Sequence, residues 1–343
     1  RQLTKWLIQN HGVTHIVLTS RAGMDAPGAA EFVEQASSMG ATLKVVACDL
    51  ADSESVEAMV EKIGSKHPLD VVCHLAGRVD DALLTAQSVE RFENVMDPKW
   101  KGAWHLHEAT QELNLSGFIL YSSIAGMIGN AGQANYSAAN ASLESLVRYR
   151  RQQGLPGIVI HWGPWSGGGM VDDVLQNHLR SRGMRLLDPL KALRAMDMVM
   201  RGAPASVGIF DIDWSQFASG SVPEKVENLL GGVAEAEEAF REAKATESQE
   251  HGSEIREALL TMPEHLRFNQ VRSVIAQEAA AVLGMGSHAS IDYQKGFMDL
   301  GIDSFMAVDL QKRLENHLGM KMPATVAFDH PTIDDLGRWV LGM

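Results

Sequence analysis

The sequence contains only two cysteines, Cys48 and Cys73, among its 343 residues. Both lie in apolar runs typical of strands, where buried reduced thiols are more common than a disulfide. The thirteen histidines lack the spacing of metal ligands. His105 and His107, for example, lie two apart on an expected helix and therefore point to different sides. The sequence thus predicts neither a disulfide-stabilised fold nor a metal site.

The sequence also lacks the run of ~20 apolar residues that a membrane span needs, and its first residues do not have the layout of a signal peptide. We therefore expect a cytoplasmic protein without a membrane partner. Positive charge is scarce as well, since 30 Lys and Arg stand against 43 Asp and Glu, for a formal net charge of −13. An excess of negative charge argues against nucleic acid as a partner.

The acidic excess is concentrated toward the C-terminus. Residues 1–218 carry 19 basic and 23 acidic side chains, whereas 219–343 carry 11 and 20. An acidic C-terminal part suits docking to basic patches on partner proteins, and an ordinary soluble surface would have the same composition.

From His15 to about Ile160, short β-rich runs alternate with amphipathic segments of helix length. This alternation is typical of a parallel sheet covered by helices, and strands that are apolar throughout fit burial on both faces. The expected strands are 15–19, 42–48, 70–75, 117–122, 157–161 and a closing segment near 206–212. We predict a doubly wound α/β domain over 1–218. An acidic linker that is helical or disordered should follow over 219–253, and a small helical domain over 254–343.

Residues 296–304 read Gly-Phe-Met-Asp-Leu-Gly-Ile-Asp-Ser and lead directly into an amphipathic segment. Asp303 can cap the helix that begins there. The free N–H groups and dipole of a first helical turn favour a negative group on Ser304, such as a phosphate diester. Apolar residues at 306, 310 and 314 mark one buried stripe of this helix. An ordinary capped helix would share these features.

The segments on either side of residues 296–304 are more specific for one type of domain. An earlier helix has apolar residues at 271, 275, 279 and 283, and Phe-Asp-His-Pro-Thr at 328–332 leads into the last helix. With these flanks the region resembles an acyl or peptidyl carrier domain of four helices, although Phe305 and His330 replace the usual Leu and Tyr. The resemblance implies that Ser304 carries a 4′-phosphopantetheine arm, attached by a phosphopantetheinyl transferase.

Four polar residues of the first domain, Lys99, Ser123, Tyr136 and Asn140, are spaced 24, 13 and 4 apart. Ser123 closes an expected strand, at the sheet edge where open α/β folds bind ligands. Tyr136 and Asn140 share one face of the next helix. The pattern resembles the short-chain dehydrogenase/reductases, which have a Rossmann-like sheet, and more closely the ketoreductase domains of polyketide synthases. Most members of the superfamily have Lys four residues after the Tyr. Here Asn140 stands at that position and Lys99 comes from the preceding helix, an exchange that is typical of the polyketide and fatty-acid synthase branch.

Ketone reduction explains why these residue types are needed. Hydride transfer builds negative charge on oxygen, which requires a hydrogen-bond donor and an acid. Tyr136 would be the acid, and the cation of Lys99 would favour its phenolate. Ser123 would hydrogen-bond the carbonyl oxygen, and Asn140 would hold a water or backbone group in a proton relay.

The resemblance also implies a cofactor site. Arg21 follows the second strand of the family fold, where its planar guanidinium could bind a 2′-phosphate and select NADPH over NADH. The other implied contacts are Asp49 and Leu50 near the adenine, the segment His74–Gly77 beside the cofactor, with Ala76 and Gly77 as its contacts, and Pro164 after the sixth strand.

The glycine-rich fingerprint of this fold does not precede Arg1, and residues 3–8 read as the tail of the helix that should follow it. The first strand of the family fold lies in the middle of the sheet, so its absence would leave two inner strand edges unpaired. We therefore expect a chain cut from a longer polypeptide, with the first β-α element missing and activity in isolation undecided.

Two marks bear on stereochemistry. Family members that form the D-configured 3-hydroxyl, called B-type, usually carry Leu-Asp-Asp, and this chain has Val79-Asp80-Asp81 there. Members of the opposite hand usually have Trp before the catalytic Tyr, where Ile128 stands. Asp81 and Ile128 thus favour B-type, although two aspartates at a solvated helix start need no function.

The combined resemblance implies the ketoreductase and carrier region of a type I modular polyketide synthase. NADPH would reduce a tethered 3-ketoacyl thioester to a 3-hydroxyacyl thioester, with ketosynthase and acyltransferase domains as partners. Two alternatives stay open: a carrier and docking unit whose reductase is incomplete, and the equivalent region of a fatty-acid synthase. Chain length, substituents, neighbouring modules, final product and oligomeric state do not follow from the sequence.

Overall fold

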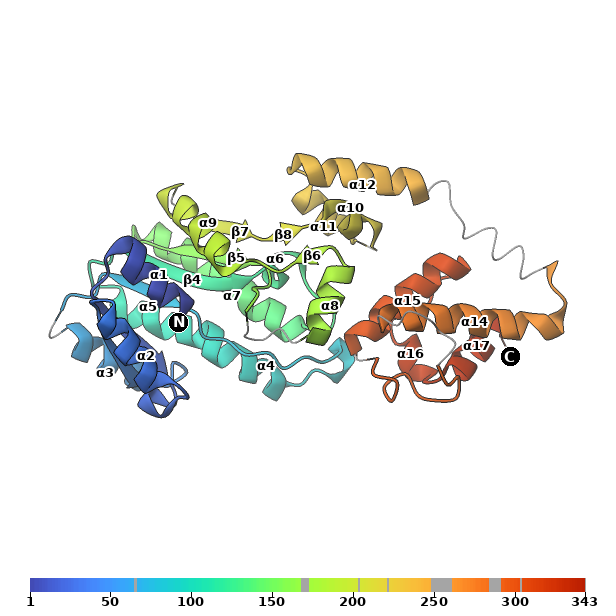
Figure 1. The fold of residues 1–343 in the computed structure, drawn as a ribbon, viewed down its shortest axis with the longest axis horizontal. Helices are drawn as coiled ribbons and strands as arrows, with labels where there is room; N and C mark the ends of the chain where they lie inside the picture. The colour runs from blue at the N-terminus through green and yellow to red at the C-terminus, as the bar shows by residue number, and fades with distance from the viewer. Residues whose placement is uncertain are drawn as a thin grey trace. The chain divides into compact units, whose positions relative to one another are not determined.

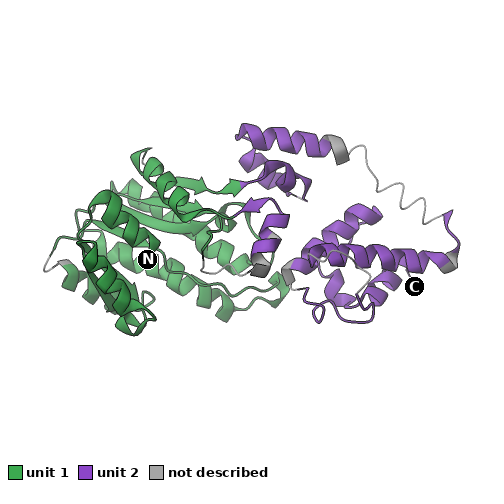
Figure 2. Cartoon of the chain, in the orientation of Figure 1, with its two compact units in different colours: residues 1–170, 186–211 green, residues 171–185, 212–343 purple. Residues whose placement is uncertain are grey.

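The computed structural model describes residues 1–64, 67–167, 173–202, 204–220, 222–247, 261–283, 291–302 and 304–342. The chain divides into two compact units. One comprises residues 1–170 and 186–211, and the other 171–185 and 212–343 (Figure 2).

Parallel strands alternate with helices along the first unit (Figure 1). The strands are β1 (His15–Ser20), β2 (Thr42–Ala47), β3 (Val71–His74), β4 (Gly117–Ser123), β5 (Ile158–Trp162) and β7 (Ser206–Ile209). The helices are α1 (Gln2–His11), α2 (Ala29–Ser38), α3 (Ser53–Gly64), α4 (Val89–Met96), α5 (Gly102–Thr110), α6 (Ala125–Ile128), α7 (Ala134–Gln152) and α9 (Pro189–Gly202). The predicted Rossmann-like α/β fold and its strands are confirmed, except that the segment expected over 206–212 is divided after Ile209.

The strands form two parallel sheets instead of one. β1 pairs with β2, while β3, β4, β5 and β7 are paired in that order. Among the described residues, β1 pairs only with β2, and β3 pairs only with β4, so each has one edge without a partner strand. Such unpaired edges were expected from the sequence, because the family fold has its first strand between them. Val71 and Leu75, beside the edge of β3, are 42% and 49% exposed, which is unusual for apolar residues of a parallel sheet.

Strand β4 lies at the centre of the larger sheet and is buried on both faces. Phe118 and Leu120 point into a core formed with α3, α5 and α7. Ile119 and Tyr121 point to the opposite face, where they contact a core that includes Leu193 of α9. Successive side chains of a strand alternate between faces, so a strand covered by helices on both sides must be apolar throughout.

A π-helical turn, η3 (Asp97–Lys101), joins α4 to α5. Proline has no backbone N–H, and its ring clashes with the carbonyl four residues earlier, so Pro98 cannot continue an α-helical ladder. The backbone forms a wider π-helical turn instead, in which the N–H of Gly102 donates to the carbonyl of Asp97, five residues earlier. Lys99 is buried at the centre of this turn.

The second unit begins with short elements around α8 (Asp173–Ser181), and its strands are β6 (Met184–Arg185) and β8 (Asp211–Ile212). Three helices follow: α10 (Trp214–Ser219), α11 (Glu224–Leu230) and α12 (Ala234–Glu247). Val226, Leu230 and Phe240 are buried among them. Of the two options expected for the acidic segment, the helical one is observed up to Glu247, and the rest of that segment lies outside the described residues.

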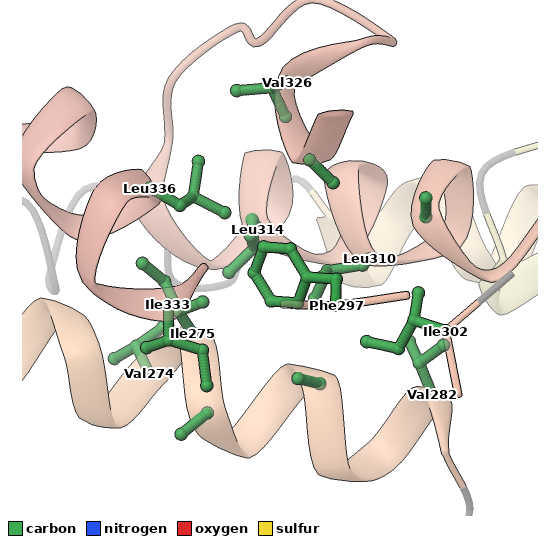
Figure 3. Packing of buried hydrophobic residues seen from close by; sticks show 14 of the residues in the cluster. Val274, Ile275, Val282, Phe297, Ile302, Leu310, Leu314, Val326, Ile333 and Leu336 are labelled. Carbon is green, nitrogen blue, oxygen red and sulfur yellow. The ribbon is translucent and has the colours of Figure 1, made fainter. Parts of the chain in front are cut away.

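The last part of the second unit consists of α14 (Glu264–Val282), α15 (Ser304–Leu318), α16 (Val326–Asp329) and α17 (Ile333–Leu341). Phe297, Ile302 and Ile333 are almost completely buried in its core (Figure 3). Leu310 and Leu314 of the predicted stripe are fully buried there, and Met306 nearly so. The predicted helical carrier fold is confirmed.

Candidate functional site

Three of the four predicted catalytic side chains meet where β4 ends and α7 begins. Ser123 is the last residue of β4, and Tyr136 and Asn140 lie one turn apart in α7. Tyr136 lies near enough to Ser123 and Asn140 for both side chains to affect the pKa of its phenol. The site therefore places a phenol and a hydroxyl together at the carboxyl edge of a parallel sheet, where such folds bind ligands.

The environment of Tyr136 has opposing effects on its acidity. Burial raises the pKa of the phenol because it disfavours the charged form, whereas the nearby polar side chains of Ser123 and Asn140 lower it. The nearby carboxylate of Asp81 raises the pKa further. Tyr136 is therefore protonated at neutral pH and able to donate its proton.

Lys99 lies beside the strand that carries Ser123. Its ammonium group donates a hydrogen bond to the Tyr121 carbonyl at 2.9 Å, and the side chain is only 4% exposed. Burial lowers its pKa to about 8. A Cβ atom on Gly77 would lie 3.0 Å from Lys99 Nζ, so this close approach favours glycine.

The low pKa of Lys99 predicts a pH-dependent effect on stability. Between about pH 8 and the usual lysine value of 10.5 the unfolded chain binds a proton that the folded chain has lost, so the free energy of unfolding should rise with pH. Compared with Lys99→Met, the wild type should gain on the order of 3 kcal/mol across this window. Urea unfolding of both proteins at several pH values measures the difference, and parallel curves would contradict the prediction.

His74 holds the turn that carries Lys99. Its Nε2 lies 2.9 Å from the Lys99 carbonyl, and burial, with the Lys99 charge, lowers the imidazole pKa to about 4. The ring is therefore neutral at pH 7, and its Nε2 must carry the proton because a carbonyl can only accept. The sequence placed this residue only beside the cofactor. Its second role, as a hydrogen-bond donor to the Lys99 turn, could have been suspected from its position at the end of an apolar strand. A polar side chain that is buried there needs a hydrogen-bond partner.

The two residues predicted to bear on stereochemistry, Asp81 and Ile128, lie near the segment that leads into α7. Asp81 accepts a hydrogen bond from Gln133 Nε2 at 2.9 Å, and the Ala82 N–H donates to the Gly132 carbonyl at the same distance. Ile128 is half-buried at the end of α6. The loop with Asp81 is thus fastened to the segment that leads into Tyr136.

Asn135 lies directly beside Tyr136 in the candidate site, and the sequence did not indicate it. It is fully buried, and its Nδ2 donates to the backbone carbonyls of Asp80 and Arg91 at 2.8 and 3.2 Å. Its Oδ1 accepts from the Tyr136 N–H at 2.8 Å. Asn135 therefore joins the loop that contains Asp80, helix α4 and the first turn of α7.

The predicted cofactor residues follow the carboxyl ends of parallel strands. Arg21 is exposed directly after β1, and Asp49 follows β2 and accepts from the Ala51 N–H at 3.0 Å. Leu50 and Pro164 are anchored through their carbonyls, to His105 Nδ1 at 2.9 Å and to the Leu187 N–H at 2.7 Å. Ala76 and Gly77 follow β3. An exposed guanidinium and an open glycine backbone at strand ends fit a phosphorylated dinucleotide.

The predicted attachment residue, Ser304, is the first residue of α15. Ile302 and Met306, on either side of it, are buried and hold this first turn against the core. The free N–H groups of that turn suit a phosphate diester. Asp303 and the side chain of Ser304 lie outside the described residues.

Both cysteines are free, with Cys48 buried and Cys73 half-buried. In the described part of the chain, the acidic, cysteine and histidine side chains form no cluster of three or more that could hold a metal ion. Nor does that part contain a helix long and apolar enough to cross a membrane.

Two protein families match the chain. The KR domain family matches residues 1–167, and the phosphopantetheine attachment site family matches 273–340. These ranges lie inside the first and last domains expected from the sequence. The fold and the Ser123–Tyr136 site thus define the first part as a ketoreductase domain. The whole chain is a ketoreductase domain followed by a carrier domain, and its homologues are type I polyketide synthases.

The curated relatives are much longer than this chain. Polyketide synthase GfsB from Streptomyces halstedii is 37% identical over 343 residues, which are 97% of this chain and 6% of GfsB. Mycoketide-CoA synthase from Mycobacterium tuberculosis is 34% identical over 342 residues, 98% of this chain and 8% of that protein. This chain therefore spans less than a tenth of either relative.

Solved ketoreductases share the fold. A structure of A-type ketoreductases from a modular polyketide synthase is 36% identical, with a TM-score of 0.63 over 66% of this chain and 48% of that one. A C2-type ketoreductase, also from a modular polyketide synthase, is 31% identical, with a TM-score of 0.61 over 69% and 50%.

Proposed function

We propose that this chain reduces a 3-ketoacyl thioester, carried on a 4′-phosphopantetheine arm at Ser304, to a 3-hydroxyacyl thioester during polyketide synthesis. The observation that carries the proposal is the meeting of Ser123, Tyr136 and Asn140 where β4 ends and α7 begins, at the carboxyl edge of the sheet. The implied partners are a phosphopantetheinyl transferase and the ketosynthase and acyltransferase domains of the same synthase.

In this mechanism NADPH supplies the hydride when bound. The Ser123 hydroxyl donates a hydrogen bond to the ketone oxygen, and Tyr136 gives that oxygen its proton as negative charge develops. The resulting phenolate is favoured by the ammonium of Lys99, which is protonated below its pKa of about 8. Asn140 helps to return a proton to Tyr136.

The tether supplies the substrate. A thioester on an arm joined to the same chain is present at an effective concentration of roughly millimolar, so the reductase needs little intrinsic affinity for it.

We propose Arg21 as the residue that selects NADPH. Its exposed guanidinium follows β1, and a planar fork binds a phosphate through two hydrogen bonds. Arg21→Ala should raise the KM for NADPH by about tenfold to a hundredfold, the loss expected for one charge-assisted contact, and leave the KM for NADH unchanged. Arg78→Ala, which removes another exposed arginine, is the control. Equal effects of Arg21→Ala on both cofactors would exclude this role.

The direct test is to mix the chain with NADPH and a simple 3-ketoacyl thioester and to follow cofactor oxidation by absorbance. Turnover would support the proposal. A D-configured product, resolved by chiral chromatography, would support the B-type assignment drawn from Asp81 and Ile128, and an L-configured product would exclude it.

A carrier and docking unit with an inactive reductase is the second candidate. The observation that favours it is the divided sheet, because Arg21 and Asp49 follow strands of one sheet, whereas Gly77 and Pro164 follow strands of the other. This candidate predicts that NADPH does not bind while Ser304 still accepts phosphopantetheine. Calorimetry with NADPH separates the two functions.

A further inference from the structure

A fully buried histidine lies behind the catalytic site. His161 is in β5, whose register places it beside Ser122 of β4. Its Nδ1 lies 3.0 Å from Ser122 Oγ and 3.3 Å from the Ser123 carbonyl, and its Nε2 lies 3.2 Å from Ser206 Oγ. The ring therefore joins three neighbouring strands of the larger sheet.

The same network reaches helix α7. The Ser122 hydroxyl donates to the Asn140 carbonyl at 3.0 Å, and Asn140 Nδ2 donates to the Tyr136 carbonyl at 2.8 Å. Ser122 and Asn140 are both buried, so water cannot replace these bonds without cost. The network thus connects the strand that ends in Ser123 with the helical turn that carries Tyr136.

The direction of each hydrogen bond follows from the partners. Because the Ser122 proton is directed to the Asn140 carbonyl, the Ser122 oxygen must accept from His161, and the Ser123 carbonyl can also only accept. His161 Nδ1 must therefore carry the proton. Burial lowers the pKa of His161, so the ring is neutral and its bare Nε2 accepts from the Ser206 hydroxyl. Glu144 Oε2, 3.7 Å from Nε2, lies beyond hydrogen-bond distance.

We propose that His161 is a positioning residue of the reductase site, and that its Nδ1–H, acting through Ser122, sets the separation of Ser123 from Tyr136 and Asn140. The inference rests on the proposed reductase function, because only a reaction at Ser123 and Tyr136 makes this separation matter. His161 does not reach the reacting atoms.

A histidine that merely fills space would give a different mutational pattern. An Asn amide nitrogen can take the place of imidazole Nδ1, whereas the amide of Gln extends toward the position of Nε2. His161→Asn therefore keeps the donor to Ser122, and His161→Gln loses it while preserving more of the side-chain volume. Positioning through Nδ1 predicts that Asn is the better substitute, and simple packing predicts that Gln is at least as good.

The experiment uses the full chain as wild type, His161→Asn, His161→Gln and Ser122→Ala. Nitrogen-15 NMR of the wild type at neutral pH should show the His161 proton on Nδ1, and a proton on Nε2 would overturn the inference. The backbone amide resonances of Ser123 and Asn140 should move in His161→Gln and Ser122→Ala but stay close to wild type in His161→Asn. Similar shifts in both His161 variants, or none in His161→Gln, would also overturn it.

Kinetics give the last readout. His161→Gln and Ser122→Ala should lower kcat for 3-ketoacyl reduction by about tenfold or more, with KM within about twofold, because misplaced catalytic groups lose rate and not binding. His161→Asn should restore most of the rate, and a loss equal to that of His161→Gln would contradict the role. If the wild type itself does not reduce the thioester, the proposed function fails, and the NMR results still decide the role of His161. If His161→Gln does not fold, Ser122→Ala carries the same comparison.

Discussion

Replacing Tyr136 with Phe should abolish reduction and leave both units folded. The substitution removes one hydroxyl from a buried side chain and keeps the ring, so the packing at the start of α7 is preserved. It also removes the acidic hydroxyl that lies near Ser123. Loss of a positioned acid costs roughly 100-fold to 10,000-fold in rate, and we expect the upper part of that range for kcat with NADPH and a 3-ketoacyl thioester.

Tyr149→Phe is the matched control for this experiment. Tyr149 lies on the same helix but is 43% exposed, and its ring contacts Trp104 and His107, away from Ser123. Its removal should leave the rate of reduction unchanged. Pantetheine loading should be normal in both variants, because the carrier has a core of its own. Wild-type turnover by Tyr136→Phe would exclude Tyr136 as the acid.

Replacing Ser304 with Ala should eliminate phosphopantetheine loading completely. The hydroxyl is the nucleophile for attachment, and alanine offers no oxygen to receive the phosphate. Incubation with coenzyme A and a phosphopantetheinyl transferase, followed by intact-protein mass spectrometry, should show the added arm on the wild type and its absence on the variant.

The loading experiment needs a control serine and a control activity. Ser273→Ala changes a half-buried serine of α14 and should load normally. Ser304→Ala should still reduce a free 3-ketoacyl thioester at the wild-type rate, because Ser304 has no part in the proposed hydride step. A loaded Ser304→Ala protein would place the attachment elsewhere, and a parallel loss of reduction would connect the carrier to the reductase in a way not proposed here.

The positions of the elements were predictable because their signals are local. Apolar runs such as 117–122 reveal a strand buried on both faces, and the spacing of Met306, Leu310 and Leu314 reveals one face of a helix. The spacing of Lys99, Ser123, Tyr136 and Asn140 marked the candidate site, and the structure brings the last three together where β4 ends and α7 begins. The division between β1 and β3 was also anticipated, because the family fold places its first strand between them.

Contacts between distant segments could not be read in the same way. The sequence analysis did not predict the π-helical turn at Pro98, and the burial of Lys99, with the lowering of its pKa to about 8, depends on residues from other strands and helices. Nothing near His161 in the sequence indicates Ser122 or Ser206 as its partners. The packing of Phe240 against Phe217, which makes the acidic segment a compact part of the second unit, was equally hidden.

The sequence by itself determined the order of strands and helices and the two domain types, and it marked the candidate reacting side chains, because periodicity and motif spacing are properties of neighbouring residues. Only the tertiary structure decided which buried polar groups meet, which proton each nitrogen carries and how far the lysine pKa falls. Those properties depend on desolvation and on hydrogen-bond partners that lie tens of residues apart along the chain.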